Sequence, residues 1–207
     1  MMISTTDHEA RRTSPLAFWR YGHDYLRAAR TLCHQHRIPC AEAQVAYHAA
    51  AQGVEFSLKA FLRARGTSAD TLRIEVGHSL SKALARSEAQ GMPAIPEPWR
   101  AAVAEIAPCH QDEQFVFLAA PDGTFPDVDP LVAAGIFVLD AIAPDVAKHF
   151  VVHLGGEATP TVETFIRRLR ADLTATFELA PAGNGPDAGL PPSWRRGPPP
   201  NAGRLYA

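Results

Sequence analysis

The stretch YHAAAQGVEFSLKAFLRARG, residues 47–66, followed by GHSL at residues 77–80, decides the fold of this chain. Its apolar residues recur at helical spacing and leave almost no polar face near its middle, which predicts a central, well-covered helix over about 41–65. Gly53 lowers helix propensity but lets a neighbouring helix approach closely. Gly66 is a typical residue with which to end such a helix. The apolar positions are Tyr47, Ala50, Val54, Leu58, Phe61 and Leu62.

Three polar side chains stand out in this stretch. Glu55 and Lys59 are four residues apart and therefore project from one face of the predicted helix. His78 opens the next helical pattern, so all three are expected where two helices meet. One interpretation is structural, with His78 capping backbone N–H groups or bonding a buried Glu55 carboxylate. The other makes Glu55, Lys59 and His78 a ligand-binding site.

The sequence on either side of this stretch also follows a helical period. Pro39 ends a first helix, Asp129–Pro130 is a helix-start signal, and Pro144 is expected to kink or break the helix that follows. Phe115–Leu118 suggests a short extended piece. With no internal repeat and no alternating strand series, the prediction is an all-α, up-down bundle of five to six helices. The other predicted helices cover about 15–36, 78–90, 96–109 and 160–178.

Two of these helices show a clear apolar stripe, which predicts the face that each one buries. The last helix carries an arginine-rich opposite side, expected to face water. The stripe of the last helix consists of Val162, Phe165, Ile166, Leu169 and Leu173, and that of the first helix of Phe18, Tyr21, Tyr25, Ala29, Leu32 and His36.

Composition and chain ends limit the function classes. A net charge of -2, with 46% hydrophobic and 20% charged residues, provides no global basic field for nucleic acid. We expect a flexible segment over 1–14, one helical domain over 15–178 and a disordered Pro/Gly-rich tail over 179–207. Three cysteines, no signal-peptide pattern, and an apolar run at 131–143 too short to span a bilayer predict a cytoplasmic protein without membrane contact.

The segments AYHAAAQGVEFSLKAFLRARG and GHSLSKAL resemble the HEPN superfamily, the helical nucleotide-binding domains of higher eukaryotes and prokaryotes. The resemblance covers about residues 15–90. It implies a HEPN-like up-down bundle that is frequently a homodimer. It also implies a role between metal-independent RNA cleavage and non-catalytic binding of nucleotide or RNA.

Catalytic members of that family use an arginine, four to six intervening residues and a histidine. Arg73 and His78 match this spacing, which would make His78 the general acid or base and Arg73 the phosphate clamp. An apolar residue, Ile74, follows Arg73, where the family favours a polar one. Arg30 with His36, and Arg27 with His34, match the spacing as well.

We expect no metal and no cofactor. Cys33, His34, His36 and Cys40 are rich in donor atoms, but helical residues two apart point nearly opposite ways and the paired spacings of zinc fingers are missing. His149 and His153 are four residues apart, yet apolar residues separate them. Cys109–His110 is an adjacent pair whose side chains diverge on a helix, so it does not suggest a dyad.

Three hypotheses follow. The first is a HEPN-like, non-catalytic module that binds a nucleotide, RNA or a protein partner through Glu55, Lys59 and His78. The second is a metal-independent endoribonuclease of a defence or toxin–antitoxin system, using Arg73 and His78. The third is a protein-interaction scaffold whose aromatic first helix, with Phe18, Trp19 and Tyr21, docks a partner. Expected partners are a second copy of the chain and a nucleotidyltransferase-type protein.

Overall fold

The computed structural model describes residues 12–35, 40–112, 114, 127–153 and 160–177. All regular structure in these residues is helical, which confirms the predicted all-α class. The predicted extended piece at 115–118 and the tail lie outside the described residues. The helices are α2 (Pro15–Gln35), α3 (Cys40–Ala64), α4 (Ala69–Thr71), the π-helix η1 (Leu72–Val76), α5 (Leu80–Ala89), α6 (Trp99–Gln111), α7 (Asp129–His153) and α8 (Val162–Phe177).

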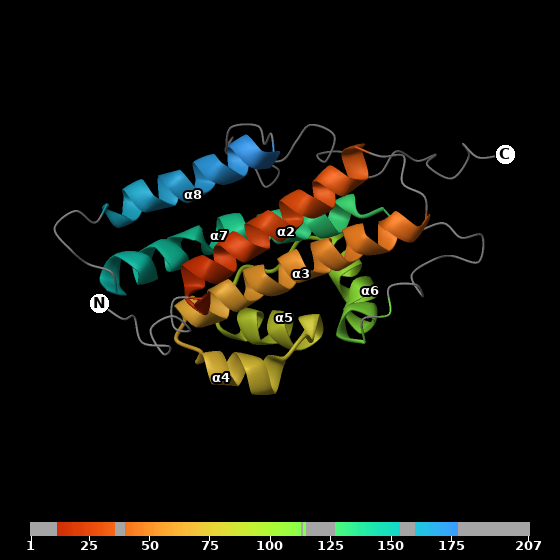
Figure 1. Ribbon diagram of the computed structural model, residues 1–207. Coiled ribbons are helices and arrows are strands. Elements are labelled where there is room, and N and C mark those ends of the chain that lie inside the picture. Colours follow the sequence, from red (N-terminus) through yellow and green to blue (C-terminus); the bar gives the residue numbers. More distant parts are fainter. Residues whose placement is uncertain (1–11, 36–39, 113, 115–126, 154–159, 178–207) are drawn as a thin grey trace, which may run out of the picture.

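Figure 1 shows α2, α3, α7 and α8 running lengthwise, with α2 antiparallel to α3 and α7 antiparallel to α8. The shorter helices α5 and α6 pack on the side of α3 away from α2, and α4 with η1 lies beyond α5. Helix α3 is therefore flanked by α2 on one side and by α5 and α6 on the other. This arrangement brings its side chains into contact with residues far along the chain.

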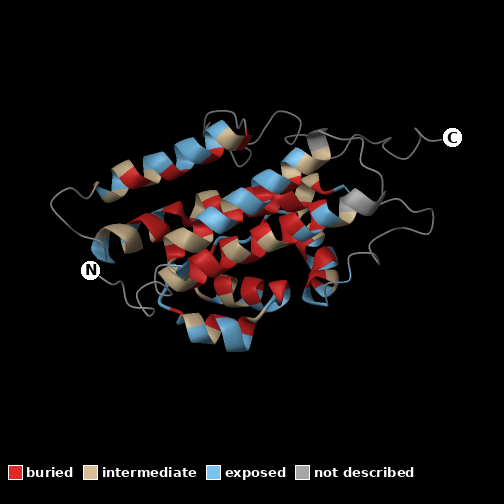
Figure 2. Cartoon of the chain, viewed as in Figure 1, coloured by how far each residue is buried: buried red, intermediate tan, exposed pale blue. Residues whose placement is uncertain are grey.

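Helix α7 forms the centre of the bundle. Among the described residues it is the helix whose length and apolar composition would suit a membrane span, but 67% of its most apolar window is buried inside the protein, as in a core helix. Of the kink or break predicted at Pro144, the break is wrong, because α7 continues through this residue to His153. Pro144 is exposed while Ala143 and Val146 are fully buried, so core packing on both sides outweighs one missing hydrogen bond. Figure 2 shows buried residues gathered where the helices face one another.

Close helix packing depends on glycine at two positions. A Cβ atom on Gly53 of α3 would lie 2.6 Å from Leu26 Cγ, and one on Gly135 of α7 would lie 2.6 Å from the Leu26 methyl carbons. The fully buried Leu26 of α2 thus occupies a space that both glycines leave open. The prediction that Gly53 permits a close approach is confirmed.

The apolar stripe predicted for the first helix is right at Phe18 and Ala29, which pack in or against the core, and wrong at its two tyrosines. Helix α2 buries Trp19, Leu26 and Ala29, whereas Tyr21 and Tyr25 are 36% and 39% exposed. The indole Nε1 of Trp19 donates a buried hydrogen bond of 3.1 Å to the carbonyl oxygen of Leu139, an interaction that a hydrophobic pattern does not encode. The last helix follows its prediction more closely and buries Phe165, Leu169, Leu173 and Phe177.

The segment between α3 and α5 determines where His78 lies. Gly66 has φ of +91°, as expected for a residue that ends a helix. The prediction that the next helix begins at His78 is off by two residues. Ser79 is the N-cap of α5, because its side chain accepts a hydrogen bond from the Lys82 backbone N–H. His78 is therefore not the capping residue, and its ring makes a different contact.

Candidate functional site

A buried carboxylate is the centre of the candidate site. Glu55 of α3 is 0% exposed, although its apolar neighbours on that helix would favour an uncharged residue. Lys59 Nζ donates to Glu55 Oε1 over 2.5 Å, and its side chain is only 10% exposed. The predicted pair four residues apart is therefore present. It is buried, which is uncommon for glutamate and lysine side chains.

Two histidines converge on the other carboxylate oxygen. His110 Nε2 lies 2.6 Å from Glu55 Oε2, and His78 Nδ1 lies 3.2 Å from the same atom. Each ring donates a hydrogen bond when that nitrogen carries the proton. His110, from α6, is 2% exposed, whereas the side chain of His78 is 66% exposed. The four side chains of the Glu55 cluster, namely Glu55, Lys59, His78 and His110, thus extend from the core to solvent.

The predicted trio of Glu55, Lys59 and His78 does come together, but His110 was not predicted. Its only signal in the sequence was its place beside Cys109, and no spacing connects residue 110 with residue 55. Helix α6 also runs to Gln111, past the predicted end at residue 109, and this carries His110 into the bundle. A contact of this kind depends on tertiary packing.

The electrostatics of the cluster favour an ionised carboxylate. Burial alone would raise the pKa of Glu55, but the hydrogen bond with His110 and the Lys59 ammonium outweigh burial and lower the pKa to about 2. Glu55 is therefore negatively charged throughout the physiological range. A buried ion pair of this kind is weak evidence for stability and is often retained for specificity or function.

The same atoms form a potential metal-ligand set. Glu55 Oε2, His78 Nδ1 and His110 Nε2 all lie within 4.8 Å of one another. Among the described residues, this is the group of three or more such side chains close enough to hold one ion. The expectation of no metal was based on other cysteine and histidine positions and did not consider this group.

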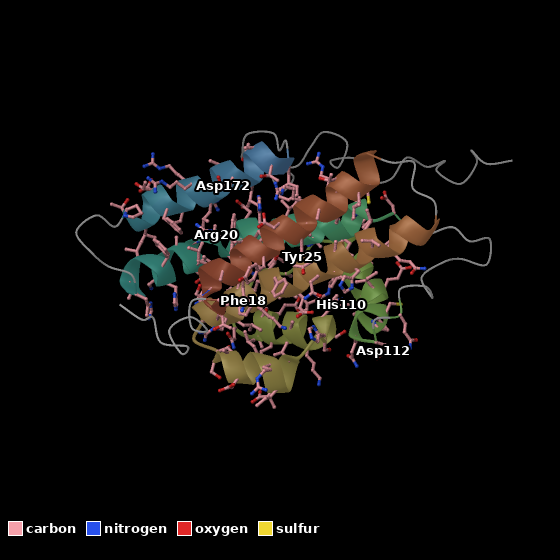
Figure 3. All side chains as sticks on the ribbon, viewed as in Figure 1. Phe18, Arg20, Tyr25, His110, Asp112 and Asp172 are labelled. Atoms are coloured by element: carbon pink, nitrogen blue, oxygen red, sulfur yellow. The ribbon has the colours of Figure 1, made fainter. Side chains whose placement is uncertain are left out.

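An aromatic face lies next to the cluster on α3. The ring of Phe56, the residue after Glu55, is 5.8 Å from the ring of Phe18, 5.5 Å from Tyr21 and 5.6 Å from Tyr25, measured between centroids. Phe56 and Lys59 are three residues apart and are therefore neighbours on the helix surface. Figure 3 labels Phe18 and Tyr25 on α2 and His110 on α6, with α3 running between those helices.

Arg73 forms its ion pair with a residue outside the Glu55 cluster. It belongs to η1, its side chain is 74% exposed, and Nη2 pairs with Asp70 Oδ1 over 3.2 Å. Arg73 thus pairs with a surface carboxylate, while His78 bonds to Glu55. The structure thus brings together the predicted ligand-binding residues Glu55, Lys59 and His78. Arg73 and His78, the predicted catalytic pair, each contact a different carboxylate.

The other cysteines and histidines considered from the sequence show no sign of an activated nucleophile or a ligand cluster in the described residues. Burial raises the pKa of the Cys33 thiol to about 11 and also raises that of Cys109, so neither thiol is activated as a nucleophile. His149 and His153 stack with centroids 4.0 Å apart on α7, and His153 Nδ1 bonds to the His149 carbonyl oxygen. The side chains of His34, His36 and Cys40 lie outside the described residues.

Comparison with models of protein families, with curated proteins and with solved structures found no match to this chain. The resemblance to the HEPN superfamily therefore stays a prediction from the sequence. The functional argument depends on the Glu55 cluster and on the aromatic face.

Proposed function

We propose that this protein is a HEPN-like helical module that binds a nucleotide or single-stranded RNA without cleaving it. The observation that carries the proposal is a half-exposed aromatic face, formed by α2 and by Phe56 of α3, beside the Glu55 cluster, to which α3 contributes Glu55 and Lys59. A base needs a flat apolar surface, and a phosphate or sugar needs hydrogen-bond donors nearby. Aromatic rings of α2 and α3 supply the flat surface, and Lys59 of α3 with His78 before α5 supplies the donors.

The aromatic face supports the recognition of a base. Tyr21 and Tyr25 keep 36% and 39% of their surface in water although the protein has a large core in which to bury them. Their contacts with Phe56 hold the rings in place, which reduces the entropy lost when a ligand stacks on them. Stacking of a base on an aromatic side chain is worth about 1–3 kcal/mol and tolerates any base.

The Glu55 cluster supports contacts with the polar part of the ligand. His78 is its most exposed member. Glu55 orients the imidazole by accepting a hydrogen bond from His78 Nδ1–H. Lys59 keeps the cluster from being purely anionic. Because the whole chain has a net charge of -2, long-range attraction for nucleic acid is weak. A nucleotide or a short single strand fits this charge better than a long duplex does.

Direct binding to the full-length protein tests the proposal. Fluorescence anisotropy with labelled single-stranded RNA, and calorimetry with the common ribonucleotides, are expected to detect binding. Replacing both Tyr21 and Tyr25 by alanine should weaken it at least tenfold, since about 1–3 kcal/mol of stacking is lost per base. The matched control is Ile74→Ala, which alters a 71% exposed apolar residue on η1. Equal affinity in the double variant and the control would contradict the proposal.

A protein partner is the competing outcome of the same experiment. The scaffold hypothesis included Trp19, but that residue is 2% exposed and cannot dock a partner without unfolding α2. The aromatic face is a protein interface if the wild type binds neither RNA nor nucleotide but sediments as a dimer. In that case the tyrosine double variant should sediment as a monomer. The homodimer and the nucleotidyltransferase-type partner stay predictions, which sedimentation of the chain alone and with such a protein would test.

Endonuclease activity is a second candidate, favoured by one observation. An exposed imidazole whose Nδ1 bonds to a buried carboxylate is oriented as a general base requires, and His78 with Glu55 meets this description. Arg73 would have to exchange Asp70 for a phosphate. Metal-independent cleavage of RNA that is lost in His78→Ala and in Arg73→Ala would support this candidate. Binding without cleavage would reject it.

A further inference from the structure

We infer that Glu55, His78 and His110 bind a divalent transition-metal ion of the zinc type. The inference goes beyond nucleotide or RNA binding and rests on the donor atoms alone. The three ligand atoms come from α3, from the turn before α5 and from α6, and lie within 4.8 Å of one another. Two imidazoles and one carboxylate form a ligand set that zinc sites use, with a water in the remaining position.

Two of the three distances between donor atoms are within about 1 Å of those around such an ion, and the third, between His78 Nδ1 and His110 Nε2, is within 4.8 Å. With metal–ligand bonds of about 2.0–2.1 Å at a tetrahedral angle, neighbouring donor atoms lie about 3.3 Å apart. His78 Nδ1 is already 3.2 Å from Glu55 Oε2. His110 Nε2, at 2.6 Å from that oxygen, would have to move outward by less than about 1 Å. The ion would take the place of the protons that now hold these contacts together.

The chemistry of the donors selects the class of ion. Calcium and magnesium bind almost entirely through oxygen, and only one oxygen of Glu55 faces the two histidines. Imidazole nitrogen favours zinc, copper, nickel and cobalt. His78 is 66% exposed, so an ion has a path to the site and a solvent molecule can complete its coordination. The buried His110 and Glu55 would hold the ion from the protein side.

The positive charge of Lys59 disfavours binding of the ion. Its ammonium binds Glu55 Oε1, which leaves Oε2 as the oxygen directed at both histidines and makes the carboxylate a monodentate ligand. The lysine charge also repels a divalent ion nearby. Replacing Lys59 by methionine, which keeps most of its apolar volume, should therefore tighten metal binding several-fold. The same substitution should weaken binding of a nucleotide, so the two proposals predict opposite effects.

Calorimetric titration of the full-length, EDTA-treated and dialysed protein with zinc chloride tests the inference. The wild type is expected to bind one zinc ion per chain, and His78→Ala is expected to bind zinc with an affinity at least tenfold lower. His78 is largely exposed, so this variant should fold, and far-ultraviolet circular dichroism checks that it does. His153→Ala is the matched control, because it removes an exposed histidine of the stacked pair on α7. Its zinc affinity should equal that of the wild type.

Cobalt substitution identifies the donor atoms. A cobalt complex of the wild type should show d–d absorption without the near-ultraviolet charge-transfer band of a thiolate ligand, which excludes the neighbouring Cys109. Zinc affinity that is the same in His78→Ala as in the wild type would overturn the inference. So would loss of binding in His153→Ala, or a wild-type protein that binds no zinc.

Discussion

The substitution Glu55→Gln tests whether the buried carboxylate is held ionised by its partners. Glutamine keeps the size and shape of the side chain but removes its charge. Burial would raise the pKa of Glu55, yet the hydrogen bond with His110 and the Lys59 ammonium lower it from an ordinary value of 4.5 to about 2. A tenfold change in proton affinity corresponds to about 1.4 kcal/mol, so the charged form contributes about 3 kcal/mol to the free energy of unfolding at pH 7.

The direction of the pH dependence follows from the lowered pKa. The contribution of Glu55 is complete above pH 4.5, where the unfolded chain is also ionised, and it is lost as the pH falls toward 2. At pH 3 it should be about 1 kcal/mol, so the wild type loses about 2 kcal/mol of this contribution between pH 7 and pH 3. Glu55→Gln lacks the titrating group and therefore lacks this loss.

Urea unfolding followed by circular dichroism, at pH 7 and pH 3 in metal-free buffer, measures the effect. We expect the wild type to exceed Glu55→Gln by about 3 kcal/mol at pH 7 and by about 1 kcal/mol at pH 3. Glu75→Gln is the matched control, because it breaks an exposed pair with Arg86 and should cost less than about 0.5 kcal/mol. A difference at pH 7 below about 1 kcal/mol, or one that does not shrink at pH 3, would refute the reasoning.

Three further predictions concern the bundle and are checked by urea unfolding. Gly53→Ala should cost about 1–3 kcal/mol, since the new Cβ would lie 2.6 Å from Leu26 Cγ. An unchanged unfolding midpoint would show that α2 and α3 move apart at no cost in free energy. Gly66→Ala meets no atom within 4 Å, so any loss, expected to be about 1 kcal/mol, comes from the backbone at φ of +91°. Trp19→Phe removes the indole hydrogen bond to the Leu139 carbonyl oxygen and should cost about 0.5–1.5 kcal/mol, whereas a loss near zero would mean that this bond contributes nothing to stability.

The sequence predicts the helices well because their apolar periods and end signals are local. The central helix was expected over about 41–65 and spans Cys40–Ala64, and Gly66 ends it as predicted. The two failures have distinct causes. Pro144 did not break α7, since burial of the residues around it outweighs a local signal. The short helices between residues 69 and 76 were missed, because their few polar residues resemble a loop.

The candidate site was predictable in part. Glu55 and Lys59 are joined by helix geometry, so their pairing could be expected from a spacing of four residues. His78 was expected near this pair because it opens the next helical pattern after a short connector. His110 and the exposure of Tyr21 and Tyr25 depend on which faces the helices turn toward one another. The same rings looked like a buried stripe, because periodicity reports an apolar face and not what covers it.

The position of Leu26 between Gly53 and Gly135 has a consequence for how this sequence can evolve. Leu26 fills space left by glycines on two other helices, so the side chains allowed at residues 26, 53 and 135 depend on one another, although these residues are far apart along the chain. A larger side chain at residue 53 or 135 would demand a smaller one at residue 26. When relatives of this protein are aligned, these three positions should covary, whereas the exposed Gly91, which has no neighbour within 4 Å, should vary independently of them.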